Sequence, residues 1–445
     1  MKKKILLTLL CALPLWAGVN GFVETYNRYW VNADSGRWTW NENNFQALFE
    51  GAPSEKLHYY AELRFRTFGF PGISSLSDLQ RKEKDRVFPY SLELKEAYAD
   101  IYGFLLDDLD LRIGKQIIAW GTADKINPTS NLSPYDLEDF FDFGAKLGVN
   151  SLKATYTKDP WSFDLCFVPV FTPSTMPPPE YADVLFGGTG LSGDYQIRNF
   201  SDTIMMPENK ITEASEAGSR VSTNIYNWDL SLSYFHGYIG FPLAEKAEMI
   251  PDSSSGTVDV RTFLSYPEVD VIGADFSGSL FGLGFWGEGA LFVPEDYVLT
   301  REIVTPQGPV SSVDTILRRD EPYLKFVLGS DYTFGDGTYI NAQYIHGFIH
   351  ENGRDSLNDY LVFRLEKKFL NDELKIAPLS FAACVTDWGE PGDNYGFVWI
   401  PEIEYKPQDN IELTLGAFVI DGKGTGMFPR MKEHDELYFK TKLSF

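Results

Sequence analysis

Few residues of this chain have the types and spacing that catalysis requires. The sequence contains no Gly-x-Ser-x-Gly and no His-Glu-x-x-His motif, and none of its five histidines lies beside a recognisable nucleophile. The glycine-rich run at 281–289 alternates glycine with apolar residues, which indicates a strand rather than a phosphate-binding loop. We therefore expect no enzymatic activity and no cofactor.

Two of the histidines occur in similar hexapeptides, YFHGYI at 234–239 and YIHGFI at 344–349. Two histidines on separate segments do not form a metal site without further ligands, so we expect no bound metal. The aromatic residues around both histidines favour a structural role at a membrane interface.

Charged side chains occur at alternate positions of segments whose other positions are apolar. In the segment 59–66, Tyr59, Ala61, Leu63 and Phe65 occupy alternate positions, and the charged residues Glu62, Arg64 and Arg66 occupy positions of the other face. Successive side chains of a strand point to opposite faces, so each such segment predicts one apolar and one water-facing surface. The basic residues of this kind are Arg28, Arg64, Arg66, Arg112, Lys440 and Lys442, and the opposing acidic set is Glu402, Glu404 and Glu412. Rows of such charges offer electrostatic selection of solutes, although they also solvate a channel by pairing with one another.

A second candidate site is the run RIGKQIIAWG at 112–121 with the loop that follows it. Its glycine at 114 permits a bulge or a close approach of backbones, and its tryptophan at 120 suits an interface belt. The alternative is that the motif only shapes a loop that turns inward. The candidate residues are Gly114, Gln116, Trp120, Gly121, Asp124, Asn127 and Pro128.

The elements that position these residues are predicted to be strands. The clearest is the last one, where Leu437, Phe439, Leu443 and Phe445 alternate with polar residues up to the end of the chain. Most candidate strands alternate over about ten residues, the length that a tilted membrane strand needs. The eighteen predicted strands are 22–31, 43–50, 57–68, 91–103, 109–120, 145–157, 161–171, 217–226, 229–240, 268–277, 281–293, 323–334, 338–349, 360–369, 374–385, 396–405, 411–420 and 437–445.

The connections between these strands differ in length according to their order. Connections after even-numbered strands are tight, as at 227–228, whereas many after odd-numbered strands are long. Short turns at one end and long loops at the other are typical of outer-membrane barrels with an even number of strands. The long loops are 69–90, 121–144, 172–216, 241–267 and 294–322, and the second and third are candidate constrictions of the lumen. The fold class is therefore an all-β, transmembrane, antiparallel up-and-down β-barrel of eighteen strands, with sixteen as the alternative.

Composition and the N-terminus agree with this fold. The basic residues 2–4 and the short apolar run 5–16 predict a signal peptide at 1–18, followed by a barrel domain at 19–445. The aromatic content is 15%, and the formal charge of −24 becomes −27 without the three lysines of the leader, which excludes nucleic acid as a partner. Cys166 and Cys384 remain in the mature chain, and we expect two free thiols on opposite walls.

The motif at 112–128 resembles a pattern in porin-like outer-membrane families, including alginate-export-like barrels. The last strand also resembles the terminal strands of bacterial outer-membrane barrels, although Lys440 stands where those strands usually carry a small residue. The resemblance implies a Gram-negative outer-membrane location, contact with the lipid bilayer and lipopolysaccharide, and recognition of the C-terminal strand by the barrel-assembly machinery.

Together these patterns predict a porin or channel through which small solutes, anionic ones among them, pass passively along a lumen narrowed by a loop. The alternatives are a structural or adhesive surface protein with a closed lumen, and a hydrolase at the rim of the barrel. The sequence does not distinguish import from export, and it leaves the oligomeric state open.

Overall fold

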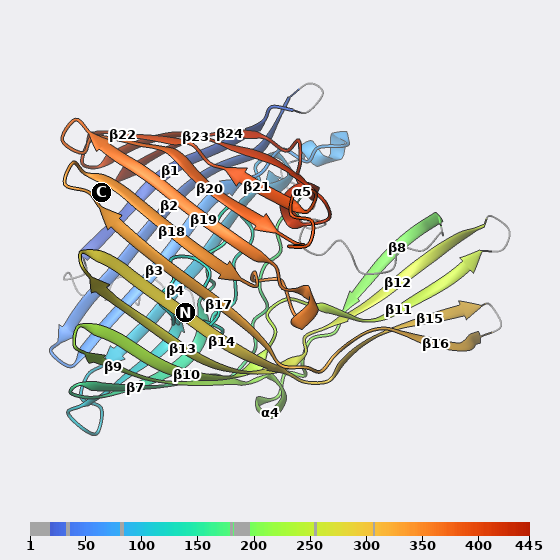
Figure 1. Ribbon diagram of the computed structural model, residues 1–445, viewed down its shortest axis with the longest axis horizontal. Coiled ribbons are helices and arrows are strands. Elements are labelled where there is room, and N and C mark those ends of the chain that lie inside the picture. Colours follow the sequence, from blue (N-terminus) through green and yellow to red (C-terminus); the bar gives the residue numbers. More distant parts are fainter. Residues whose placement is uncertain are drawn as a thin grey trace, which may run out of the picture.

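The computed structural model describes residues 18–32, 36–80, 84–178, 181, 196–252, 256–305 and 308–445. Apart from Gly18, the predicted signal peptide lies outside these residues. Within them the chain is almost entirely β-structure, with five short helical turns of three or four residues each (Figure 1). No helix in this part of the chain is long and apolar enough to cross a membrane.

The main element is a closed antiparallel barrel. Its segments are β1 (Gly18–Trp30), β2 (Arg37–Ser54), β3 (Leu57–Phe68), β4 (Tyr90–Ile101), β5 (Leu109–Gln116), β6 (Val149–Lys158), β7 (Trp161–Val168), β9 (Glu216–Ile225), β10 (Trp228–Tyr238), β13 (Glu268–Leu280), β14 (Leu283–Pro294), β17 (Tyr323–Thr333), β18 (Thr338–His346), β19 (Asp359–Phe369), β20 (Leu374–Val385), β21 (Tyr395–Trp399), β22 (Glu402–Gln408), β23 (Ile411–Lys423) and β24 (Glu436–Ser444).

The strand pairing confirms the predicted number of strands. The sheet has nineteen segments, but β21 and β22 both pair with β20 and β23 and are two parts of one strand interrupted at Ile400 and Pro401, which leaves eighteen strands. Pairing of β24 with β1 closes the barrel, and Phe445 exchanges two backbone hydrogen bonds with Gly21. Closure removes the unpaired edges that a bilayer does not tolerate.

Alternation of side chains gives the wall an apolar outside. On β24, Leu437 and Phe439 are exposed on the outer face, whereas Tyr438 between them is buried inside. The same pattern exposes Leu230 and Leu232 on β10. An apolar outer face around a closed antiparallel barrel is the architecture of proteins that lie in the bacterial outer membrane.

The tight connections lie at one end of the barrel, as predicted. Between β9 and β10, Tyr226 and Asn227 both have positive φ, as do Phe281 and Gly282 between β13 and β14. Two consecutive residues with positive φ form the two-residue type I′ turn, whose twist matches that of the flanking strands. The long loops therefore leave the opposite, extracellular end.

Three of the long loops were predicted as loops but contain strands. The strands in these loops are β8 (Gln196–Ile204), β11 (Leu243–Asp252), β12 (Thr257–Ser265), β15 (Tyr297–Thr305) and β16 (Gly308–Arg319). These five segments form a second sheet that projects beyond the barrel (Figure 1). Two pairings in it, β11 with β15 and β12 with β8, are parallel and join different loops. The expectation of irregular loops was therefore wrong at these positions.

The interior of the barrel contains apolar clusters rather than only water-facing residues. One cluster joins Tyr26 and Trp40 on the wall to Leu137 and Phe140 of the loop after β5. The predicted free thiols are confirmed, since Cys166 and Cys384 are both unpaired and buried. The apolar clusters show that a loop occupies part of the lumen.

Candidate functional site

The lumen is narrowed by residues 117–148, which connect β5 to β6 and which we call the inward loop. β5 ends at Gln116, four residues earlier than predicted, because the chain turns into the barrel there. The backbone N–H of Ile117 donates to Glu96 Oε1 at 2.7 Å instead of continuing the ladder. Gly114 precedes the turn with φ of 135°, where an added Cβ would lie 2.3 Å from the carbonyl oxygen of Ala97.

The motif residues Gln116 and Trp120 are both buried inside the barrel. Gln116 donates from Nε2 to the carbonyl of Ser151 at 3.3 Å, which ties the end of β5 to β6. Trp120 packs in a cluster with Leu132 and Val168. The prediction that Trp120 belongs to an interface belt was therefore wrong, because the turn at Ile117 carries it into the lumen.

One carboxylate on the wall holds the beginning of the inward loop. Glu288 of β14 accepts hydrogen bonds from the backbone N–H groups of Ala123 and Thr129, from Asn127 Nδ2 and from Thr129 Oγ1, at 2.9, 3.3, 2.9 and 2.6 Å respectively. Position 121, beside this carboxylate, requires glycine, because the φ of Gly121 is 90° and an added Cβ would lie 2.3 Å from Glu288 Oε2. Glu288 was not among the residues predicted from the sequence. The available signal was a single carboxylate in a glycine-rich strand.

The loop also contacts strands further round the wall. Asp124 Oδ2 accepts hydrogen bonds from Asn341 and Gln343 on β18, at 3.0 and 2.7 Å. Further along the loop, Phe141 stacks on Phe418 of β23 with ring centroids 3.7 Å apart. One loop is thus bonded to strands on several sides of the lumen. Of the motif residues, Asp124 and Asn127 bond to the wall. The carbonyl oxygen of Pro128 accepts a hydrogen bond from Asn131 within the loop.

Arg28 is the most deeply buried charge at this level of the barrel. Its guanidinium donates to Asp139 of the inward loop at 3.0 Å and lies 3.5 Å from Glu436 of β24. It also lies 4.1 Å from the centre of the Trp40 ring. Tyr181 donates to Glu436 at 2.5 Å, so the described part of the 172–216 loop reaches the same cluster. Residues 179–180 and 182–195 of that predicted constriction lie outside the described residues, and residues 196–204 form β8 of the extracellular sheet.

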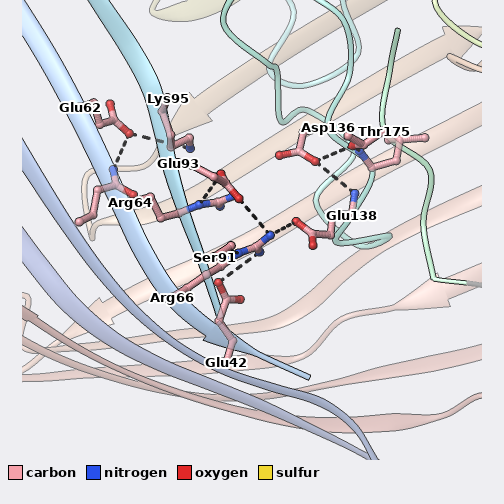
Figure 2. Close-up of polar contacts among 12 residues, drawn as sticks. Glu42, Glu62, Arg64, Arg66, Ser91, Glu93, Lys95, Asp136, Glu138 and Thr175 are labelled. Carbon is pink, nitrogen blue, oxygen red and sulfur yellow. Dashed lines mark hydrogen bonds and ion pairs between the residues drawn. The ribbon is translucent and has the colours of Figure 1, made fainter. Parts of the chain in front are cut away.

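The predicted charged rows of β3 and β5 point into the barrel and are paired, and Figure 2 shows the pairs of β3. Arg64 bonds to Glu93 at 2.7 Å, and Arg66 bridges Glu42 on the wall and Glu138 on the inward loop. Arg112 bonds to Asp100 at 2.5 Å in the same way. Their role in selecting solutes stays a prediction.

The acidic set is paired as well. Glu402 lies 3.2 Å from Arg364, and Glu404 lies 2.5 Å from Lys375. Lys406 contacts both Glu404 and Glu412, at 2.9 and 3.3 Å. Glu412 of β23 is in register with Lys442 of β24, so the acidic and basic sets occupy neighbouring strands.

Two predicted lysines differ from the other charges. Among the residues that the structure describes, Lys440 and Lys442 have no carboxylate within 4 Å; their ammonium groups lie 4.1 Å from the Tyr26 ring and 4.3 Å from the Phe22 ring. Glu24 on β1 attracts both lysines from beyond ion-pair distance. Lys440 therefore adds a positive charge to the lumen that is not held in a direct ion pair.

Burial changes the ionisation of two groups on the inward loop. Lys146 is buried beneath the Tyr135 ring and donates to the carbonyl of Ser130, and burial lowers its pKa to about 7 against the opposing attraction of Glu288. Burial raises the pKa of Glu138, although Arg66 partly offsets the shift.

A cavity of about 580 Å³ lies between the inward loop and the wall formed by β18–β24 and β1. Its lining combines apolar side chains with Arg364, Lys440 and the loop residue Asp124. Cavities of this size accommodate small organic molecules. This chamber and the inward loop together form the candidate functional site.

The two histidine hexapeptides form the same arrangement on the outer face. Tyr234 and His236 both bond to Asp270 of the neighbouring strand, at 2.6 and 3.0 Å. Tyr344 and His346 bond to Asp359 at 2.6 and 2.8 Å. Within the described ranges, no group of three or more His, Cys, Asp or Glu side chains could hold a metal ion.

Comparison with known proteins gives structural likeness only. No family model matches the chain, and no curated protein matches it. The similar solved structures include OmpF of Salmonella typhi in complex with daunomycin, with 9% identity, 96% of this chain and 97% of that chain covered, and a TM-score of 0.41. OmpT, an outer membrane protein of Vibrio cholerae, has the same identity and coverages and a TM-score of 0.42. Values this low add nothing to what the strand pairing itself shows: the protein is an outer-membrane β-barrel.

Proposed function

We propose that the protein is a passive outer-membrane channel whose lumen is narrowed by the inward loop. The observation that carries the proposal is the path of that loop, which crosses the barrel and is bonded to Glu288 on one side and to Arg28 on another. Barrels of this strand number leave an aqueous lumen unless something folds inward. A loop that fills only part of the lumen converts a wide pore into a selective one.

The proposed mechanism is diffusion past charged rows, with a preference for anions. Most luminal charges are neutralised locally, as with Arg64 and Glu93 or Arg112 and Asp100. Both pairs join neighbouring strands of one wall and add little net field to the lumen. The anionic preference therefore depends mainly on Lys440 and Lys442, which lack such partners among the described residues.

The test is single-channel conductance of the refolded mature protein in a planar bilayer. We expect steady openings and a reversal potential that indicates anion preference under a salt gradient. Replacing Lys440 and Lys442 with glutamine is expected to shift that potential toward zero, whereas Lys367→Gln at the turn end serves as the matched control. A folded barrel that stays silent under all conditions would exclude the channel.

A second function, binding at the cell surface, is favoured by the extracellular sheet. Three loops converge on one five-stranded sheet and are joined by ion pairs such as Lys246–Glu302, at 2.6 Å. Simple diffusion requires no such sheet. Insertion through the C-terminal strand by the barrel-assembly machinery, and contact with lipopolysaccharide, belong to either function.

A further inference from the structure

The chamber beneath the inward loop is apolar on one level and polar on the next. Val362, Ala382 and Val398 are register partners on β19, β20 and β21, and all three line the cavity. They form a continuous apolar row on a luminal wall, where a purely diffusive pore presents polar groups to water. Phe141 and Phe143 extend this apolar surface from the loop above.

The next row of lumen-facing side chains, two residues along each strand toward the periplasmic turns, is polar. Arg364 follows Val362 on β19 and is in register with Asn341 and Ser380. Lys440 follows Tyr438 on β24 in the same direction, and it also lines the cavity. The chamber is therefore amphipathic along the barrel axis.

The charges of the lining indicate which polar group the chamber lacks. Its carboxylates already have donors: Asp139 is bonded to Arg28, Asp142 to Lys125 and Glu402 to Arg364. Asp124 accepts two amide hydrogen bonds from β18. Lys440 is the lining cation with no carboxylate within 4 Å in the described part of the chain. An anionic group on a solute would neutralise it.

We propose that the chamber binds small amphipathic carboxylates, with a compact apolar body against the Val362–Ala382–Val398 row and the carboxylate at Lys440. This inference names the solute class of the proposed channel and rests on that function only for its physiological role. A cavity of about 580 Å³ admits a ring system of about ten carbon atoms together with water, and the ring can stack on the phenylalanines of the inward loop.

The test is isothermal titration calorimetry on the full barrel in detergent, which requires no conduction. The probes are 2-naphthoate, 2-naphthylmethanol, which has the body without the charge, and acetate, which has the charge without the body. We expect 2-naphthoate to bind at least tenfold more tightly than either of the others. Equal binding of 2-naphthoate and 2-naphthylmethanol, or competition by equimolar acetate, would overturn the proposal.

Three variants locate the site. Lys440→Gln is expected to weaken 2-naphthoate binding about tenfold and to leave 2-naphthylmethanol unchanged. Lys367→Gln is the control, because Lys367 of β19 pairs with Asp336 and does not line the chamber, and it is expected to change binding less than twofold. Ala382→Leu is expected to fill the apolar row and to weaken both aromatic probes. An unchanged affinity in Lys440→Gln, with the folded barrel verified by its heat-modifiable mobility, would exclude the site.

Conductance recorded on the same preparations separates the two proposals. Selective binding by a barrel that does not conduct contradicts the channel and supports the chamber as a binding site. Conductance without selective binding supports the channel and contradicts the assigned solute class.

Discussion

Glu288 lies between two glycines on β14, and its carboxylate faces the inward loop. It accepts four hydrogen bonds from the loop, and water has little access to it. The neighbouring glycines place no side chains beside it on its strand. Sequence patterning predicted that the loop turns inward but did not identify this acceptor, because its four bonds connect residues that are about 160 positions apart.

Replacing Glu288 with alanine is expected to release the inward loop while the barrel stays closed. A hydrogen bond to a charged group contributes about 1.5–3 kcal/mol, so the summed loss of four such bonds destabilises the docked loop by about 6 kcal/mol or more. The expected readout is a larger and noisier single-channel conductance. Asp275→Asn is the control, because Asp275 faces Glu288 across the ladder but bonds to Arg220 and Ser231 instead of the loop. Unchanged conductance in Glu288→Ala would contradict the role of Glu288 in docking.

Arg28→Met is expected to destabilise the protein by about 3–5 kcal/mol, because it leaves the buried Glu436 and the partly buried Asp139 without their cation. The measurement is the midpoint of urea-induced unfolding in detergent. Adding Asp139→Asn and Glu436→Gln is expected to recover much of the loss, since no uncompensated charge then remains. Arg64→Met is the control and is expected to cost about 1 kcal/mol or less, because its partner Glu93 is partly exposed.

At the scale of elements, the inward loop depends on backbone conformations as well as on side chains. Gly121→Ala is expected to undock the loop, because the residue has φ of 90° and the new Cβ would meet the Glu288 carboxylate. The expected result is the same increase in conductance as in Glu288→Ala, without an additive effect in the double variant. Gly335→Ala in a periplasmic turn is the control, since nothing lies within 4 Å of its added Cβ.

Docking of the inward loop is also expected to depend on pH through Lys146. Its pKa is lowered to about 7 when it is buried, so between about pH 7 and its ordinary value of 10.5 the undocked state binds more protons than the docked state. The docked state therefore gains stability as the pH rises through this window and loses it as the pH falls to 7. We expect fewer loop-opening transitions in bilayer recordings at pH 9.5 than at pH 7, and no such difference in Lys146→Met. An equal response in both proteins would assign the effect to another group.

The elements of the barrel were predictable from the sequence because their signal is local. Alternation over about ten residues defined each strand, and the order of short and long connections defined the two ends. The interior could not be predicted in the same way. The alternation rule ends with the ladder at Gln116, so it placed Trp120 at an interface, whereas the turn at Ile117 carries it inside.

At the scale of the whole molecule, the feature that the sequence did not predict is the extracellular sheet. Its pairings β11–β15 and β12–β8 are parallel and connect loops that are separated by barrel strands. No local pattern identifies the partner of such a strand, because the pairing depends on where the barrel brings the loops. Cross-loop ion pairs such as Arg198–Asp259 hold the sheet together after the barrel has positioned it.

If the extracellular sheet depends on the barrel but the barrel does not depend on the sheet, removal of one hairpin of the sheet has a predictable outcome. Replacing residues 243–265, which comprise β11 and β12, with a short Gly-Ser linker is expected to leave the barrel intact. β10 and β13 pair directly from Trp228 to Tyr238, and the deletion retains Phe241, which packs in the core of the lumen. Heat-modifiable mobility and single-channel conductance are expected to match those of the full-length protein.

The same deletion is expected to disrupt the rest of the extracellular sheet. β8 loses its partner β12, and β15 loses β11, which leaves β15 and β16 as an isolated hairpin. A two-stranded hairpin is only marginally stable in water. Limited proteolysis within 297–319 should therefore become faster while the barrel strands stay protected. Loss of the barrel in this variant would instead mean that the sheet and the barrel form one cooperative unit, in which the extracellular loops help to close the wall.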